Sequence, residues 1–281
     1  MNAGKRHFLV IAAASRGGRL FAKKALRQGH DVTAICRATS DQAALSRIQG
    51  LLQDTKLTEG GVAEAEHTGI LKARNSNIFE PAVYQALLES DQSIDAICCF
   101  VGVTTIKEML NRQQQLYTKT IHALVEGMRQ SRWVETFYHG SVGSEGVPGK
   151  SVTAWPANFP MLSGLTQRLF PVFKDTTQSE NILSQNKAAG LQFVIFRPAR
   201  LKDGPAKRQY GFTFDTTGMD KEDLPLRYAT TSINREDVAE EILRVTTLPK
   251  HEREQWHGHG VYLVDMKKEY FNTAILKPNN S

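Results

Sequence analysis

Cysteine is scarce in this sequence, which has only Cys36, Cys98 and Cys99 among its 281 residues. Three cysteines cannot all pair with one another, and the last two lie inside an apolar run that is typical of a buried strand. A disulfide scaffold is therefore disfavoured. Unreactive thiols in a reducing compartment are favoured instead, which predicts a cytoplasmic protein.

Long apolar runs and blocks of like charge are missing as well. The apolar stretch behind the basic segment 1–7 ends at Ser15, so we expect no signal peptide, no membrane-spanning helix and no membrane partner. The net charge is +6, but the basic residues are spread along the chain and do not cluster beside aromatic side chains. We therefore expect no nucleic acid partner. A small-molecule substrate is the expected partner, and a homodimer stays open.

A metal site is not indicated either. His257 and His259 flank Gly258 near the end of the chain, but two histidines alone are too few ligands for a structural metal ion. We interpret this segment as a turn before the last strand and expect no metal.

Short apolar runs alternate with amphipathic segments along the chain. Strands are expected at 7–11, 31–36, 70–73, 94–101, 133–139, 192–196 and 260–264, and helices at 19–28, 41–53, 80–88, 106–130, 176–188 and 236–246. This alternation predicts parallel strands joined by right-handed crossovers. We therefore expect an α/β fold with a doubly wound, Rossmann-like parallel sheet, in a single domain 1–281 with a small C-terminal substrate-binding portion.

Two segments lack a regular pattern and are rich in loop-forming residues. Substrate-binding elements are expected within residues 142–175 and 202–232. Four large apolar residues in the first segment either line a substrate pocket or simply cover the end of the sheet: Trp155, Phe159, Met161 and Phe170.

The turn between the first strand and the first helix is made of small residues. In such a turn the backbone can approach a pyrophosphate, and the helix start supplies N–H groups and a positive dipole. The turn predicts a cofactor-binding site at Ala12, Ser15, Arg16, Gly17 and Gly18.

This turn and four further motifs resemble those of atypical short-chain dehydrogenases/reductases, in the NmrA-like and biliverdin reductase B-like branch. The turn corresponds to Gly-x-x-Gly-x-x-Gly, with Ala12 and Ser15 replacing the first two glycines and Gly18 keeping the third. The other four are Asn77-Ile78-Phe79-Glu80-Pro81, Phe137-Tyr138-His139-Gly140-Ser141, Phe196-Arg197-Pro198-Ala199-Arg200-Leu201 and Ile233-Asn234-Arg235-Glu236-Asp237-Val238-Ala239. The resemblance covers residues 7 to 265, and it implies further cofactor contacts at Asn77, Ile78, Phe100, Val101, Gly102 and Pro198.

The end of the second strand bears on the choice of cofactor. An acidic residue there binds the ribose 2′-hydroxyl of NAD, whereas a guanidinium pairs with the 2′-phosphate of NADP. This sequence has Arg37 at that place, and Arg16 is expected to close on the same phosphate from the other side. The expected cofactor is therefore NADP(H). The alternative is that both are ordinary solvated arginines.

The catalytic group of the classical superfamily is missing, because no Tyr-x-x-x-Lys occurs in the chain. The resemblance implies catalytic roles for Ser141, a hydrogen-bond donor, and for Lys174 and Asp175, which stand where that tyrosine is usual. Each has a structural alternative: Ser141 as a turn residue and Asp175 as the N-cap of its helix. We interpret His139 as a core histidine.

These observations favour an NADPH-dependent reductase of a small, aromatic or polycyclic, organic substrate. Two alternatives keep the fold. One is a biosynthetic isomerase or cyclase without a redox step, and the other is a non-enzymatic regulator that senses NADP(H), as NmrA-like proteins do.

Overall fold

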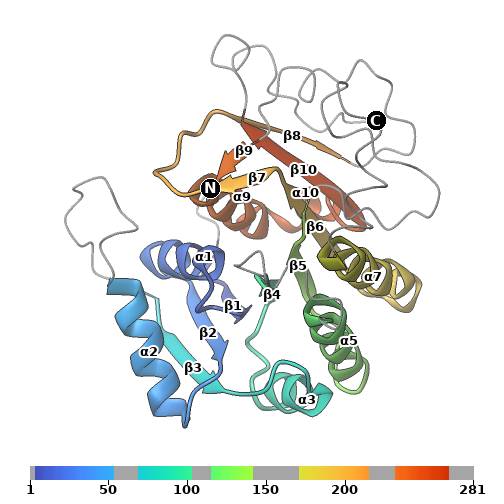
Figure 1. The fold of residues 1–281 in the computed structure, drawn as a ribbon. Helices are drawn as coiled ribbons and strands as arrows, with labels where there is room; N and C mark the ends of the chain where they lie inside the picture. The colour runs from blue at the N-terminus through green and yellow to red at the C-terminus, as the bar shows by residue number, and fades with distance from the viewer. Residues whose placement is uncertain (1–3, 54–68, 103–114, 142–170, 215–231, 266–281) are drawn as a thin grey trace.

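The computed structural model describes residues 4–53, 69–102, 115–141, 171–214 and 232–265. They form a central sheet with helices on both faces (Figure 1). The substrate-lining residues expected at 155–170 lie outside the described ranges, so that expectation stays a prediction.

The sheet has eight strands in the order β3-β2-β1-β4-β5-β6-β10-β8. All neighbouring strands are parallel except the last pair, β10 and β8. The strands are β1 (His7–Ile11), β2 (Asp31–Cys36), β3 (Leu71–Asn75), β4 (Ala96–Cys99), β5 (Glu135–His139), β6 (Phe193–Pro198), β8 (Tyr210–Phe214) and β10 (His259–Asp265). The chain runs outward from β1 in both directions, as in a doubly wound fold, so the predicted architecture is confirmed.

The helices cover the two faces because side chains alternate along each strand. Phe8 and Val10 of β1 belong to the core under one face, and Leu9 and Ile11 to the core under the other. The first face carries α1 (Arg16–Arg27), α2 (Asp41–Gln53) and α9 (Arg235–Thr247), and the second carries α3 (Pro81–Ser90), α5 (Leu116–Arg129) and α7 (Pro171–Gln185).

The structure corrects several predicted boundaries. Helix α1 begins at Arg16, not at 19, because Ser15 caps it, and α7 spans 171–185, not 176–188. The second expected substrate segment is not a simple loop. It contains β8 and begins at the last residue of β7 (Arg200–Lys202), and β7 pairs in parallel with β9 (Ser232–Asn234) in a separate two-stranded sheet. The partners of β7 and β8 lie about thirty and about fifty residues away, so no local pattern predicts these strands.

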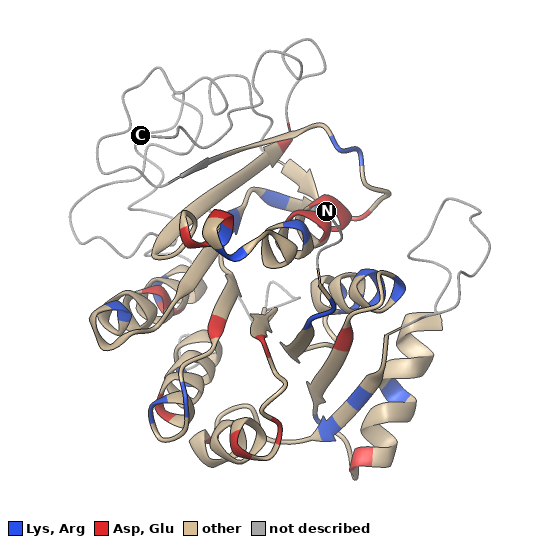
Figure 2. Ribbon diagram, turned by 180° about the vertical axis from the view of Figure 1, so that it is seen from behind, with Lys and Arg blue, Asp and Glu red and all other residues tan. Residues whose placement is uncertain are grey.

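Two short elements complete the described fold, η2 (Lys187–Ala189) and α10 (Lys250–Glu254). The turn expected before the last strand is present, with Gly258 at a φ of 80°. Lysine and arginine are interspersed with acidic residues on many elements (Figure 2). Within the described part of the chain, no helix is long and apolar enough to cross a membrane, and no group of histidine, cysteine and acidic side chains could hold a metal ion.

Candidate nucleotide-binding site

The candidate site lies at the carboxyl edge of the parallel sheet. Because these strands are parallel, the segments that follow β1, β2, β4, β5 and β6 all leave the sheet at this edge. After β1 the chain adds β2 and β3 on one side of β1, and it then returns to add β4 on the other side. Such a topological switch point opens a crevice in which doubly wound proteins bind their ligands.

Ala12 shapes the turn that follows β1. Its φ is 58°, in the left-handed region that favours glycine, and the amide of Ser15 donates to its carbonyl oxygen over 2.9 Å. A side chain in this region costs about 1–2 kcal/mol. Ala12 therefore adopts the backbone conformation that the family's glycine would provide.

Ser15 is the N-cap of α1. Its backbone is extended, and its Oγ accepts a hydrogen bond from the amide of Gly18 over 3.1 Å. The amides of Arg16 and Gly17 also lie in the first turn, where a helix offers no acceptor of its own. This helix start therefore presents N–H groups and the positive end of a dipole at the sheet edge.

The two glycines of the turn are required by close packing. A Cβ on Gly18 would lie 2.5 Å from the carbonyl oxygen of Ala12, and one on Gly17 would lie 3.1 Å from the Phe100 ring. Phe100 in turn packs against Phe21, with ring centroids 5.3 Å apart. Helix α1 therefore packs directly on the turn. The backbone atoms of the turn and of the helix start form a cradle, and a side chain at Gly18 would fill part of it.

His139 ends β5 beside this cradle. It is half-buried, its ring centroid lies 5.8 Å from that of Phe100, and burial lowers its pKa to about 4. The imidazole is therefore neutral at neutral pH. These contacts agree with the interpretation of His139 as a packed histidine rather than an acid catalyst.

The two arginines expected at the 2′-phosphate have different surroundings in the structure. Arg37 is exposed after β2, and its carbonyl oxygen accepts a hydrogen bond from Arg47 over 2.8 Å. Arg16 instead pairs with Asp203 over 2.8 Å, and the same carboxylate binds Arg235, at the start of α9, over 2.6 Å. Arg16 is therefore directed toward α9.

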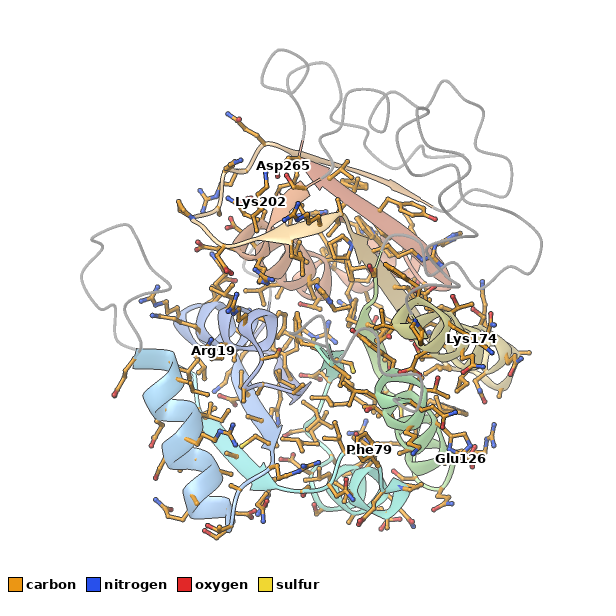
Figure 3. The ribbon with its side chains drawn as sticks, viewed as in Figure 1. Arg19, Phe79, Glu126, Lys174, Lys202 and Asp265 are labelled. Atoms are coloured by element: carbon orange, nitrogen blue, oxygen red, sulfur yellow. The ribbon has the colours of Figure 1, made fainter. Side chains whose placement is uncertain are left out.

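The remaining cofactor-contact predictions lie at the same edge. Asn77 is exposed, and its side-chain amide donates to Glu80 over 2.7 Å, while the carbonyl of Ile78 accepts from the Tyr84 hydroxyl over 2.8 Å. Phe79, the residue after Ile78, is labelled in Figure 3. Three further residues follow or end strands, with only the second of them exposed: Val101, Gly102 and Pro198.

The three predicted catalytic residues have different surroundings. Ser141 follows β5 at the sheet edge, two residues beyond His139, and Lys174 is exposed on α7 (Figure 3). Asp175 is only 4% exposed, and its two carboxylate oxygens accept the amides of Tyr117 and Thr118 over 2.9 and 3.0 Å. Asp175 thus caps the start of α5. The alternative that it caps its own helix is wrong, because α7 begins at Pro171.

We predict that Asp175→Ala lowers the free energy of unfolding by about 1–2 kcal/mol, because α5 has no side-chain cap of its own and loses the acceptor for two first-turn amides. Denaturant unfolding measures the change. Gln178→Ala, an exposed position on the same helix, is the matched control and should change stability by less than about 0.5 kcal/mol. Equal losses in the two variants would contradict the capping role.

One feature of the site edge escaped sequence reasoning. Glu180 of α7 and Arg197 of β6 form a buried ion pair of 2.9 Å, with side chains 1% and 5% exposed. A Cβ on Gly140 would lie 2.6 Å from the Glu180 carboxylate, and one on Gly260 would lie 2.2 Å from the Arg197 guanidinium. The pair ties α7 to the end of the sheet. The Phe-Arg-Pro motif marked Arg197, but nothing local indicated its partner.

Comparison with known proteins agrees with this geometry. A protein-family model described as NAD(P)H-binding matches residues 12–249, which include the turn, the sheet edge and α9. No curated protein sequence matches the chain.

Solved structures share the fold at low sequence identity. The terminal R domain of the myxalamid PKS-NRPS biosynthetic pathway superposes with a TM-score of 0.64 at 15% identity, over 96% of this chain and 70% of that one. The oxidoreductase ylbE of Lactococcus lactis gives 0.59 at 14% identity, over 95% of each chain. The anaerobilin reductase ChuY of Escherichia coli O157:H7 gives 0.53 at 18% identity, over 97% and 99% of the two chains. At sequence identities this low, the structural similarity establishes the fold alone.

Proposed function

Because this chain belongs to the NAD(P)H-binding family, we propose that it is an NADPH-dependent reductase of a small, aromatic or polycyclic, organic substrate. The observation that carries the proposal is the cradle at the start of α1, where Ala12 takes a left-handed conformation and Gly18 packs on the Ala12 carbonyl at the carboxyl edge of the sheet. The anaerobilin reductase of the same fold supports it.

The residues of the edge fit a dinucleotide. The first-turn amides of α1 would hold the pyrophosphate, and Arg37 would pair with the 2′-phosphate. Residues beyond β3, β4 and β6 would line the rest of the cofactor, namely Asn77, Ile78, Phe100, Val101, Gly102 and Pro198. When bound, the cofactor supplies a hydride.

The protein's part in reduction is to orient the acceptor and to supply a proton. The Ser141 hydroxyl, at the end of β5, would donate a hydrogen bond to the acceptor oxygen, and the proton would come from Ser141 or from solvent. Lys174 is an exposed cation on the helix that faces this end of the sheet. Asp175 would act indirectly, by fixing the start of α5 through its two amide contacts.

The proposal is tested by titrating the purified protein with NADPH and NADH in a calorimeter, and then following NADPH absorbance with a panel of quinones, flavins and enones. We expect tighter binding of NADPH and its oxidation by at least one acceptor class. Absence of affinity for both nucleotides would refute the proposal.

We predict that Ser141→Ala lowers kcat for NADPH oxidation by at least about tenfold while the Kd for NADPH stays within about twofold, because one donor to the developing charge is lost. Ser90→Ala, at the exposed end of α3, is the matched control and should leave both values unchanged. An unchanged kcat in Ser141→Ala would remove Ser141 from the mechanism.

An NADP(H)-sensing regulator is the second candidate. It is favoured by the missing Tyr-x-x-x-Lys and by the engagement of both Asp175 oxygens with α5, which leave few side chains for proton transfer. Tight cofactor binding without oxidation by any acceptor would favour this role. Product formation without a change in the cofactor's redox state would instead indicate an isomerase or cyclase.

A further inference from the structure

We propose that Arg19, in the first turn of α1, is a second specificity-determining residue for the 2′-phosphate of NADP(H), acting together with Arg37, while Arg16 pairs with Asp203 in the direction of α9. This inference rests on the proposed preference for NADPH and extends it to a residue that no motif indicates. It follows from the rotation of α1 about its own axis, which determines the direction of each of its side chains.

One side of α1 faces β4 and α9. Gly17 and Phe21 both lie against Phe100, which follows β4, and Lys24 pairs with Glu236 of α9 over 2.9 Å. These contacts fix the rotation of α1 about its own axis. The ion pair of Arg16 with Asp203 also points toward α9, because Asp203 binds Arg235 at the start of that helix.

Arg19 lies on the other side of α1. A helix turns by about 100° per residue, so Arg19 is roughly 200° from Gly17 and within about 20° of Leu26. The Leu26 carbonyl accepts the amide of Gly69, which precedes β3, over 3.1 Å, and this contact places that side of α1 near the chain that links α2 to β3. Arg19 therefore faces β2 and α2. Figure 3 labels it on α1.

That side of α1 is where the chain leaves β2 and reaches Arg37. Both Arg19 and the end of β2 lie at the carboxyl edge, because α1 begins there and β2 is parallel to β1. In a doubly wound fold the adenosine ribose is bound between the start of α1 and the end of β2. A 2′-phosphate at this place would have one guanidinium from each element.

Arg19 has no partner within the described part of the chain. Its buried Nε–H donates no hydrogen bond, and its guanidinium forms no ion pair with those residues. A cation in the first turn of a helix also opposes the helix dipole, so its position is not explained by the stability of α1. A phosphate held between Arg19 and Arg37 would accept hydrogen bonds from the Arg19 guanidinium. Its negative charge would also interact favourably with the positive end of the helix dipole.

The test compares Arg19→Met with the parent protein by calorimetric titration with NADPH, NADH, 2′,5′-ADP and 5′-ADP. Methionine keeps the apolar stem but removes the charge. We expect the affinity for NADPH and 2′,5′-ADP to fall by about tenfold or more, and that for NADH and 5′-ADP to change by less than about twofold. Arg19→Lys, which keeps a charge without the planar fork, should give an intermediate loss.

Arg27→Met is the matched control. Arg27 lies in the last turn of the same helix and also has a buried, unpartnered Nε, but it is about 12 Å from Arg19 along the helix axis and away from the site edge. It should leave all four affinities unchanged. Equal losses of NADPH and NADH binding in Arg19→Met, or loss of the NADPH preference in Arg16→Met instead, would overturn the inference. If the parent protein binds neither nucleotide, the proposed function itself fails, and if it prefers NADH, the proposed NADPH preference fails.

Discussion

Replacing Glu135 by glutamine should lower the free energy of unfolding by about 3–5 kcal/mol. Glu135 begins β5 at the amino edge of the sheet, and its side chain is 7% exposed. Its carboxylate accepts hydrogen bonds from Arg6 over 2.9 Å and from Arg253 over 3.0 Å, and the Nε2 atom of His257 lies 2.7 Å away. Glutamine would leave two buried guanidinium groups without an anion, which is the costly way to break a buried pair.

The same cluster predicts an acid-sensitive stability. Burial alone would raise the pKa of Glu135, but hydrogen bonds from His257, Arg253 and Arg6 lower it to about 2, from an ordinary value of 4.5. Because the pKa is lower in the folded state, the contribution is fully present above about pH 4.5 and is lost as the pH falls toward 2. The shift corresponds to about 3 kcal/mol.

Denaturant unfolding between pH 7 and pH 3 measures both effects. The parent protein should lose stability across this range, and Glu135→Gln should lack the part of that loss due to Glu135. The control is Glu254→Gln on α10, whose 3.9 Å pair with Lys250 is exposed, and it should cost less than about 0.5 kcal/mol. An unchanged pH dependence in Glu135→Gln would contradict the assignment.

Adding a single methyl group at Gly18 should abolish measurable binding of NADPH and NADH alike, a loss of about a hundredfold or more. The new Cβ would lie 2.5 Å from the Ala12 carbonyl oxygen and 3.0 Å from the Ala13 Cα, both of them backbone atoms that cannot rotate away. Helix α1 would have to move off the turn, and its first-turn amides would leave the position at which they meet a pyrophosphate.

Gly50→Ala is the matched control for Gly18→Ala. Gly50 lies in α2, and a Cβ there would meet no atom within 4 Å. This substitution should raise stability by up to about 1 kcal/mol, because alanine is the better helix former, and should leave both nucleotide affinities unchanged. Calorimetric titration and thermal unfolding of the two variants separate local damage to the cradle from a general loss of folding. Normal NADPH affinity in Gly18→Ala would place the pyrophosphate elsewhere.

Local patterns in the sequence were sufficient for the architecture. The strands from β1 to β6 and β10, apart from the polar edge strand β3, are apolar runs with turn signals at their ends, and the helices between them show regular apolar spacing. Their alternation alone implies a parallel, doubly wound sheet. The turn after β1 was also recognisable, because small residues followed by a helix start are a local signal.

The directions of the charged side chains could not be read in this way. Arg16 and Arg37 are predicted to meet at one phosphate, and the structure adds a pairing of Arg16 with Asp203, far away in the sequence, that no local pattern indicates. The three-residue error at the start of α1 matters here, since each residue turns a side chain by about 100° around the helix. One interpretation of Asp175 likewise made it the N-cap of its own helix, whereas its carboxylate caps α5.

The amino-acid sequence by itself determined the order of strands and helices and the small-residue turn that leads into α1, because both depend on residues that are neighbours along the chain. Only the tertiary structure decided the ion pair of Glu180 with Arg197, the pairing of β7 with β9, and the side of α1 on which each arginine lies. These features join residues from distant segments, whose contacts exist only after the helices have packed on the sheet.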